Sequence, residues 1–243
     1  KFRILFTPFD ENSLNYLIKK KYNTIKISSS DITTIPFLEQ ISKHKIKIIM
    51  SSGMSKINDI NNAIKTLTAN KKIYKKDINL LYCVSSYPTE LSEIDLKKIK
   101  ELTNKYKHHN IGLSDHTKSK VTGAISVTFG ATIIEKHVTI NNSFIGPDHK
   151  SSLNINDFKE YVTNIRDAEK ILNEKKKKNN QNKNIRYVRK YLVAIKKIKK
   201  DERFTRLNLG YMRCTKGVHE SKYYKKFLNQ ISIKNYEKFE PIK

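Results

Sequence analysis

Two histidines have the residue type and spacing that could bind a metal ion. His116 follows one short apolar run, and His137 ends the next one along the chain. If these runs are neighbouring strands, about 4.8 Å apart, the two imidazoles could hold one divalent ion, with water or substrate oxygens completing its shell. The alternative is a pair of hydrogen-bonded histidines, and the spacing alone does not choose between the two.

Hydroxyl side chains follow one apolar run after another, and a lysine lies within one of these runs. Hydroxyls, backbone N–H groups at helix starts and a lysine are the groups that bind an anionic phosphate. The candidate hydroxyls are at residues 7, 28–30, 51–52, 85–86 and 114, and the lysine is Lys26. This pattern predicts a phosphate cradle. Helix N-capping is the alternative role for the same hydroxyls, and both roles can hold together.

The elements that must position these residues alternate between two periodicities. Apolar runs typical of strands cover residues 2–7, 24–28, 47–51, 78–84, 110–114 and 132–137. Amphipathic helical patterns cover residues 13–20, 57–67, 91–102, 121–129 and 155–172. Strands that alternate with helices predict βαβ units and a parallel sheet. The polar clusters then fall at the carboxyl ends of the strands, where α/β barrel enzymes carry their sites.

Composition limits the function classes. The 243 residues carry 49 basic and 23 acidic side chains, a net charge of +26. The excess is mostly lysine, whereas base and phosphate readers of nucleic acids rely on arginine. We therefore expect no nucleic-acid partner, and a basic nucleic-acid-binding protein remains an alternative. No apolar run approaches the length of a membrane span. Two cysteines form no disulfide framework, and we expect a reducing, cytoplasmic location.

A change of composition divides the chain. Residues 173–184 read NEKKKKNNQNKN and predict a solvated linker. Residues 1–172 would form the larger domain and residues 185–243 a small β-rich one. Within the latter, short apolar runs at 191–195, 207–211 and 231–233 predict strands. A domain of about 60 residues is marginally stable alone and would be expected to dock.

An ordered set of motifs resembles the sialic acid synthase family, which includes N-acetylneuraminate, legionaminate and pseudaminate synthases. The motifs are TPFD (7–10), KISSSD (26–31), SSGM (51–54), YCVSSYPT (82–89), GLSDHT (112–117), IEKH (134–137) and GPDHKSSL (146–153). Residues 189–217 resemble the family's C-terminal SAF, or antifreeze-like, domain. The resemblance implies an α/β fold: a (β/α)8 TIM barrel followed by a small β-rich SAF (β-clip) domain. About six of the eight βα units are expected here, and six strands cannot close such a barrel.

The resemblance also implies an activity. The family condenses phosphoenolpyruvate with N-acetylmannosamine or a related acylamino sugar, or its 6-phosphate, and releases phosphate. A divalent metal, Mn²⁺ or Mg²⁺, would be held by His116 and His137, which would be the catalytic residues. By this resemblance, the phosphate and carboxylate of phosphoenolpyruvate would be bound by Thr7, Lys26, Ser29, Ser51, Ser85 and Ser114. Tyr87 and Asp148 would meet the sugar, and Arg213 would reach its N-acyl group from the partner subunit of a domain-swapped homodimer.

The sequence departs from the family pattern at some points. Cys214 replaces the proline that usually follows the SAF-domain arginine, and Ser85 stands where relatives often carry Asn or Thr. The family's first two strands, which bring a catalytic Glu, have no counterpart here. We therefore expect an N-terminally truncated chain, which could be inactive alone. A degenerate, non-catalytic family member is the alternative.

Overall fold

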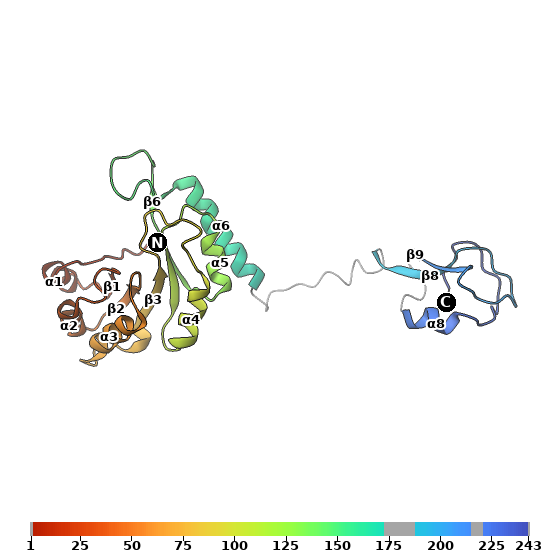
Figure 1. Ribbon diagram of the computed structural model, residues 1–243, viewed down its shortest axis with the longest axis horizontal. Coiled ribbons are helices and arrows are strands. Elements are labelled where there is room, and N and C mark those ends of the chain that lie inside the picture. Colours follow the sequence, from red (N-terminus) through yellow and green to blue (C-terminus); the bar gives the residue numbers. More distant parts are fainter. Residues whose placement is uncertain (1, 173–187, 215–220, 243) are drawn as a thin grey trace. The chain divides into compact units, whose positions relative to one another are not determined.

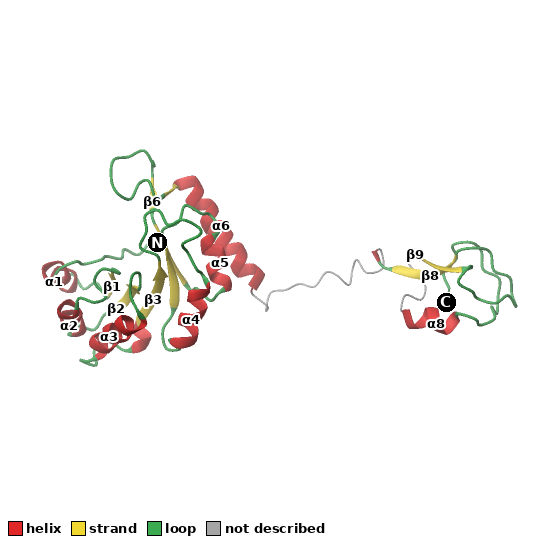
Figure 2. Ribbon diagram, in the orientation of Figure 1, coloured by secondary structure: helices red, strands yellow, loops and turns green. Residues whose placement is uncertain are grey.

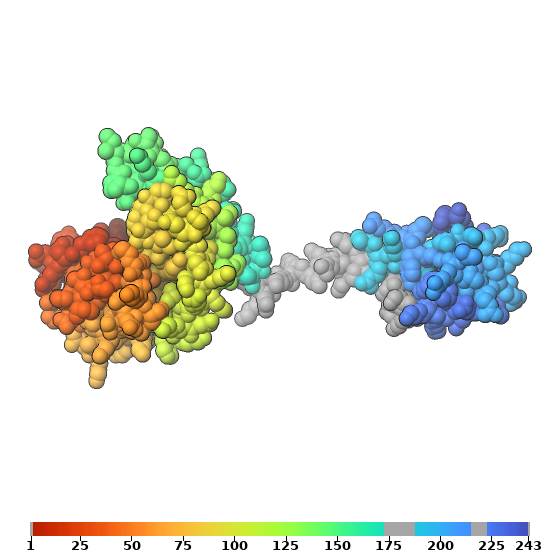
Figure 3. All heavy atoms as spheres, viewed as in Figure 1, coloured from red at the N-terminus to blue at the C-terminus, as the bar shows by residue number. Residues whose placement is uncertain are grey.

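The computed structural model describes residues 2–172, 188–214 and 221–242, which belong to two compact units, Lys1–Lys175 and Lys176–Lys243 (Figure 1). The expected linker, 173–184, lies outside the described residues. Residues 185–187 and 215–220 of the expected SAF domain lie outside them too. Figure 3 shows the first unit as a packed body of side chains.

A parallel sheet forms the centre of the first unit. Its strands are β1 (Thr24–Ile27), β2 (Lys47–Ser51), β3 (Ile78–Cys83), β4 (Ile111–Asp115) and β5 (Ile133–Lys136). They lie side by side in sequence order, each parallel to the next. The strands are added in sequence order at one edge, so all the right-handed crossovers lie on the same face of the sheet. With the helices on that face, the sheet curls into a half-barrel of the α/β class (Figure 1).

Helices cover the outside of this half-barrel (Figure 2). They are α1 (Glu11–Lys19), α2 (Ile35–Ser42), α3 (Ile57–Thr68), α4 (Lys97–Lys105), α5 (Thr122–Thr128) and α6 (Ile155–Leu172). A 3-10 turn, η1 (Lys75–Asp77), and a short parallel pair, β6 (Val138–Thr139) and β7 (Leu153–Asn154), complete the unit. Helix α3 shows why these segments are helical: Ile60, Ala63, Ile64 and Leu67 form one buried stripe at helical spacing.

Five of the six expected strands are confirmed to within two residues at each end, and the first is wrong. In residues 2–7 only Phe6 forms an isolated parallel bridge, to Ile25, and the Lys26 N–H donates to the Phe6 carbonyl over 2.9 Å. The side chains of Phe2 and Ile4 are exposed. This segment pairs on one side through a single bridge, which is too little to build a regular strand.

One helix prediction needs correction, and one helix was missed. The helix expected at 91–102 begins only at Lys97 and ends at Lys105. Helix α2 was not expected at all, although Pro36 lies in its first turn and Phe37, Leu38 and Ile41 are buried. Proline is favoured in the first turn of a helix, so Pro36 is compatible with a helix that begins at Ile35.

The second unit contains an antiparallel pair, β8 (Lys190–Ala194) and β9 (Leu209–Arg213), and helix α8 (Ser221–Phe227). The strand expected at 231–233 is wrong: Ile231 forms only an isolated bridge to Arg203. Leu192, Ile198, Phe204 and Tyr236 are among the residues of its small core. Among the helices that the structure describes in either unit, none has the length and apolar character needed to cross a membrane.

Candidate functional site

The carboxyl ends of the parallel strands surround a cavity of about 280 Å³. Parallel strands end at the same edge of their sheet, so side chains distant in sequence meet there. The lining residues are Thr7, Phe9, Lys26, Ser28, Ser29, Ser51, Cys83, Tyr87, Ser114, His116, Glu135 and His137. The curl of the sheet makes this edge concave.

An ion pair spans the cavity. Lys26 Nζ lies 2.8 Å from Glu135 Oε1, although Lys26 is on β1 and Glu135 on β5, at opposite edges of the sheet. The Ser114 hydroxyl also donates to Glu135 Oε1, over 2.6 Å. Burial raises the pKa of Glu135, but the attraction of Lys26 and these hydrogen bonds outweigh it and lower that pKa below its ordinary value. Glu135 is therefore an anion whose charge Lys26 balances.

His116 is held in one tautomer. Its Nδ1 lies 2.7 Å from the Val84 carbonyl oxygen, which can only accept, so Nδ1 carries the hydrogen. Burial lowers the pKa of His116, which keeps the ring neutral at pH 7 and leaves a lone pair on Nε2. Ser114 Oγ is 3.3 Å from Nε2, but its one hydrogen is donated to Glu135. The Nε2 lone pair is therefore available to an electron-pair acceptor.

These features fit a divalent cation. The rings of His116 and His137 lie 5.5 Å apart, centre to centre, at 88° to each other. A carbonyl that fixes the second ring nitrogen, as Val84 does for His116, is the usual support of a metal-binding histidine. His137 Nδ1 lies 3.8 Å from Asp148 Oδ1. Over residues 2–172, 188–214 and 221–242, no cluster of three or more His, Cys, Asp or Glu side chains could hold a metal. His116 and His137 would thus leave most of the ion's shell to water or substrate.

The floor of the cavity contains an unsatisfied hydroxyl. Ser51 is 3% exposed, and within the described part of the chain its Oγ makes no well-formed hydrogen bond, although a weak interaction with the Cys83 thiol acts to lower that thiol's pKa. A buried hydroxyl without a partner costs about 1–3 kcal/mol, so it marks a place for a ligand. Nearby Gly53 allows close packing: a Cβ there would lie 2.4 Å from Ser85 Oγ and 2.6 Å from Cys83 Sγ.

Tyr87 covers one side of the histidines. Its ring is centred 4.2 Å from that of His116 and 6.0 Å from that of His137. Burial raises the pKa of the Tyr87 phenol, which stays protonated at neutral pH and can donate a hydrogen bond. An aromatic face beside a polar rim suits the mixed surface of a sugar.

The structure brings most of the sequence-predicted residues to this one cavity. The predicted residues that line it are Thr7, Lys26, Ser29, Ser51, Tyr87, Ser114, His116 and His137. Ser85 is not among the lining residues, and its Oγ lies 3.5 Å from Ser29 Oγ. Asp148 is a mostly exposed neighbour of His137. Arg213 is exposed on β9 of the second unit. The roles of all these residues remain predictions.

Glu135 is the main residue to which sequence reasoning gave no role. Cys83 and Phe9 also line the cavity without having been given a role. The signal for Glu135 was available, because a lysine expected inside a buried strand needs a counter-ion. Glu135 is the last residue but one of β5, so it is an acidic residue near the same edge of the sheet.

Comparisons with known proteins agree with this geometry. Residues 1–177 match the model of the NeuB family. The chain is 38% identical over 241 residues to an N,N'-diacetyllegionaminic acid synthase of Campylobacter jejuni, covering 98% of this chain and 71% of that protein. It is 31% identical over 233 residues to a pseudaminic acid synthase of Helicobacter pylori, covering 95% and 67%.

A solved structure shows the same architecture. The N-acetylneuraminic acid (sialic acid) synthetase of Leptospira borgpetersenii superposes with a TM-score of 0.66 at 33% identity, over 74% of this chain and 62% of that one. The half-barrel therefore has a TIM-barrel-like α/β fold. From the family match over residues 1–177 and the relatives that share most of its length, the chain belongs to the NeuB family.

Proposed function

We propose that this protein takes part in the condensation of phosphoenolpyruvate with an acylamino sugar, giving a sialic-acid-type nonulosonate and free phosphate. The observation that carries the proposal is the cavity itself. Lys26, Ser114, His116 and the unsatisfied Ser51 hydroxyl converge at the carboxyl ends of five parallel strands. Lys26 and the hydroxyls can donate hydrogen bonds to an anion, and the lone pair of His116 Nε2 lies beside them.

The charge of the cavity supports a cation as the third component. Lys26 and Glu135 balance each other, and His116 is neutral. A phosphate monoester carries roughly −1.5 to −2 at pH 7, and the carboxylate of phosphoenolpyruvate adds one more negative charge. An overall neutral cavity would bind this anion weakly. A divalent ion, Mn²⁺ or Mg²⁺, held by His116 and His137 would supply positive charge and polarise the aldehyde oxygen of the sugar as a Lewis acid.

The protein side chains would bind and orient the two substrates. Lys26 and the hydroxyls of Thr7, Ser29 and Ser51 would bind the phosphate and carboxylate, with Ser85 supporting Ser29. Ser114 would join them once its hydrogen turns from Glu135 to the substrate. In the reaction, C3 of phosphoenolpyruvate forms a bond to the aldehyde carbon of the open-chain sugar. Water then adds at C2, and the bond from C2 to the phosphate oxygen breaks as C2 becomes a ketone and phosphate leaves. The two hydrogens of the water end on the former aldehyde oxygen and on the phosphate. Holding the two carbons in line is the main contribution expected of the cavity.

The sugar would lie against Tyr87 and Asp148. Relatives are named for legionaminic, pseudaminic and N-acetylneuraminic acids, so we assign the acceptor as an acylamino aldehyde sugar. Phosphate release from phosphoenolpyruvate, measured with a panel of such sugars and with and without EDTA, tests the proposal. We expect sugar-dependent release that EDTA abolishes. Two outcomes would contradict the proposal. One is phosphate release that does not depend on the sugar, and the other is release that persists both in EDTA and after replacement of the two histidines by alanine.

Ser51 offers a sharper version of this test. Ser51→Ala should lower phosphate release, because it removes the hydroxyl that awaits a ligand. Ser42→Ala is the matched control: Ser42 is equally buried, but it bonds Asn70 and the Glu39 carbonyl at the outer helices. Equal activity of the two variants would argue against anion binding at the cavity floor.

We further propose, on the family resemblance, that the second unit is a SAF domain and acts across a homodimer. Arg213 would then hydrogen-bond the N-acyl carbonyl of the sugar in the partner's site, a task that suits a planar guanidinium. Mixing an Arg213→Ala subunit with a His116→Ala subunit tests this. If sites form in trans, the mixed dimer contains one intact site and regains activity. Verified heterodimers without activity would refute the arrangement.

A further inference from the structure

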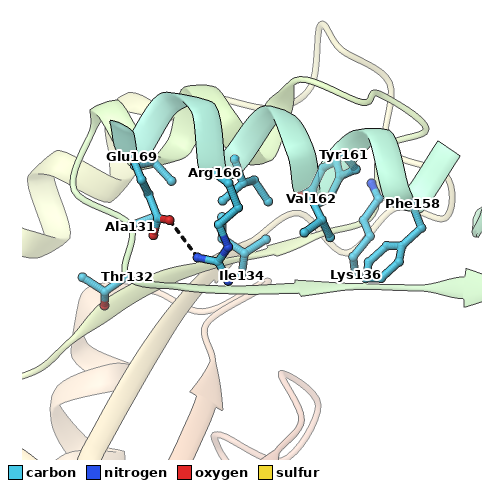
Figure 4. Close-up of a pocket in the computed structure, with 11 residues that line it drawn as sticks. Ala131, Thr132, Ile134, Lys136, Phe158, Tyr161, Val162, Arg166 and Glu169 are labelled. Carbon is cyan, nitrogen blue, oxygen red and sulfur yellow. Dashed lines mark hydrogen bonds and ion pairs between the residues drawn. The ribbon is translucent and has the colours of Figure 1, made fainter. Parts of the chain in front are cut away.

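A second ion pair lies beside the cavity but outside it. Lys136 Nζ is 3.0 Å from Asp115 Oδ2, and the two side chains are 2% and 0% exposed. Successive residues of a strand face opposite sides, so Glu135 enters the cavity while Lys136 extends from β5 toward α6. Figure 4 shows Lys136 there, with Tyr161 and Phe158 beside it.

Asp115 is fully engaged in hydrogen bonds. Its Oδ2 accepts from the Tyr161 hydroxyl over 2.8 Å and from the Thr122 hydroxyl, in addition to Lys136. Its Oδ1 accepts from the Thr117 backbone N–H over 2.9 Å. Lys136 in turn donates to the Thr117 carbonyl. The pair therefore holds both backbone groups of Thr117, and α5 and α6 hold the pair.

The bonded residues flank the two histidines in sequence. Asp115 and Thr117 lie on either side of His116, and Lys136 precedes His137. A displacement of either charged side chain would move the backbone on which an imidazole is mounted. By contrast, the bond from His116 Nδ1 to the Val84 carbonyl fixes the ring's tautomer but not its distance from His137.

Stability alone is a weak reason for such a pair. Well-packed apolar side chains of similar volume often replace a buried ion pair without loss of stability, because two charges must be stripped of water. What an ion pair adds is direction: its atoms bond at fixed angles and distances. A device that sets the relation between two strand ends needs that property.

We propose that Asp115 and Lys136 form a positioning pair that sets the mutual orientation of His116 and His137. The pair touches no substrate and acts through the backbone at residues 115–117 and 136–137. The expected effect of the pair on cation binding rests on the proposed function. The expected effect of the pair on the orientation of the two rings does not depend on that function.

The test is a double variant, Asp115→Asn with Lys136→Met, which removes both charges and leaves neither one unpaired. We expect cooperative unfolding to be retained. Without metal, the ¹⁵N-histidine NMR signals of His116 and His137 should shift, whereas His116 should keep its Nδ1–H tautomer, because the Val84 carbonyl is unchanged. With Mn²⁺, measured by electron paramagnetic resonance, affinity should fall about 10- to 100-fold, as is typical when the partners of metal ligands are lost.

Lys120→Met is the matched control. Lys120 forms an exposed ion pair with Glu160 of α6, the helix that also carries Tyr161. It should leave both readouts unchanged. Wild-type histidine signals and Mn²⁺ affinity in the double variant would overturn the proposal and assign the pair to fold stability. If the wild type binds no Mn²⁺, the proposed cation fails, and the metal-free histidine signals still decide the positioning role.

If the double variant does not fold, a milder variant tests the same proposal. Tyr161→Phe removes one hydrogen bond to Asp115 and keeps the ring that packs against Gly123. The same metal-free signals should shift by a smaller amount, and Mn²⁺ affinity should fall several-fold. No change in either would refute the positioning role.

Discussion

Two ion pairs end on adjacent residues of β5, yet their surroundings differ sharply. Glu135 pairs with Lys26 inside the cavity, and its side chain remains 34% exposed. Lys136 pairs with Asp115 on the other face of the strand, where neither side chain is more than 2% exposed. The first pair lines the cavity, whereas the second pair is almost completely shielded from solvent. The alternation of a strand thus lets one short segment present an exchangeable pair to a ligand and a fixed pair to its supporting helix.

The largest effect should follow from breaking the fixed pair on one side. Lys136→Met leaves Asp115 charged and buried without a counter-ion, which costs about 3–5 kcal/mol of unfolding free energy. Lys26→Met should cost clearly less, because water can reach Glu135. Denaturant unfolding of the two variants makes the comparison. Equal losses would show that the two pairs do not differ in the way their exposure indicates.

The exchangeable pair should instead affect substrate binding. Lys26→Met should raise the KM for phosphoenolpyruvate about 10- to 100-fold, since a hydrogen bond to a charged group contributes about 1.5–3 kcal/mol. The KM for the sugar should change little. Lys47→Met is the control for the loss of a lysine, because Lys47 is the exposed first residue of β2, at the end of the strand away from the cavity. Parallel increases in both KM values would point to a structural role for Lys26.

A smaller effect should appear in the pH dependence of stability, at a histidine far from either pair. Like His116, His109 bonds a backbone carbonyl through Nδ1, here Ile78 at 2.9 Å, and burial lowers its pKa. Below about pH 6.5, the unfolded chain takes up a proton that folded His109 resists, so stability falls as pH falls. His109→Gln should reduce this acid loss by about 1 kcal/mol or less.

Urea unfolding at pH 7.5 and at pH 5.5 measures the His109 effect. The buried histidine of the cavity is present in both proteins, so the difference isolates His109. Phosphate release should be unchanged in the variant, because His109 is not a lining residue of the cavity. An acid loss as steep as that of the wild type would contradict the linkage.

The smallest effect should come from an ion pair that is exposed on both sides. Arg166 and Glu169 on α6 lie 2.8 Å apart, with side chains 64% and 48% exposed (Figure 4). Pairs of this kind contribute about 0.3–0.5 kcal/mol. Glu169→Gln should therefore change the unfolding free energy by no more than about 0.5 kcal/mol. A larger loss would mean that distance, rather than exposure, ranks the three pairs.

Much of the first unit could be predicted from the sequence because its pattern is local. Strands such as β2 and β3 are short apolar runs followed by turn residues, and α3 shows a clear helical stripe. Residues 2–7 carry the same local signal but pair only through Phe6. A strand depends on neighbours that its own sequence does not encode, so this segment was predicted wrongly.

The cavity residues could be predicted as a group, and the supporting network could not. Strand-end hydroxyls and histidines share one recognisable position, which is why they were found together. Asp115 and Lys136 stood inside the same motifs, but alternation turns them away from the cavity. Their partner Tyr161 lies on α6, 46 positions after Asp115. Only the packing of that helix shows what the two charges are for.

The unsatisfied hydroxyl of Ser51 has a consequence for ligand discovery. A ligand that binds the folded chain and not the unfolded one adds about 2.7 kcal/mol of stability at a concentration of 100 Kd. The melting temperature therefore rises. Anions that satisfy Ser51 should give larger shifts than anions that bind the basic surface. Melting curves recorded with a library of phosphorylated three-carbon acids and acylamino sugars could therefore rank candidate substrates before any turnover is detected, with Ser51→Ala as the reference protein.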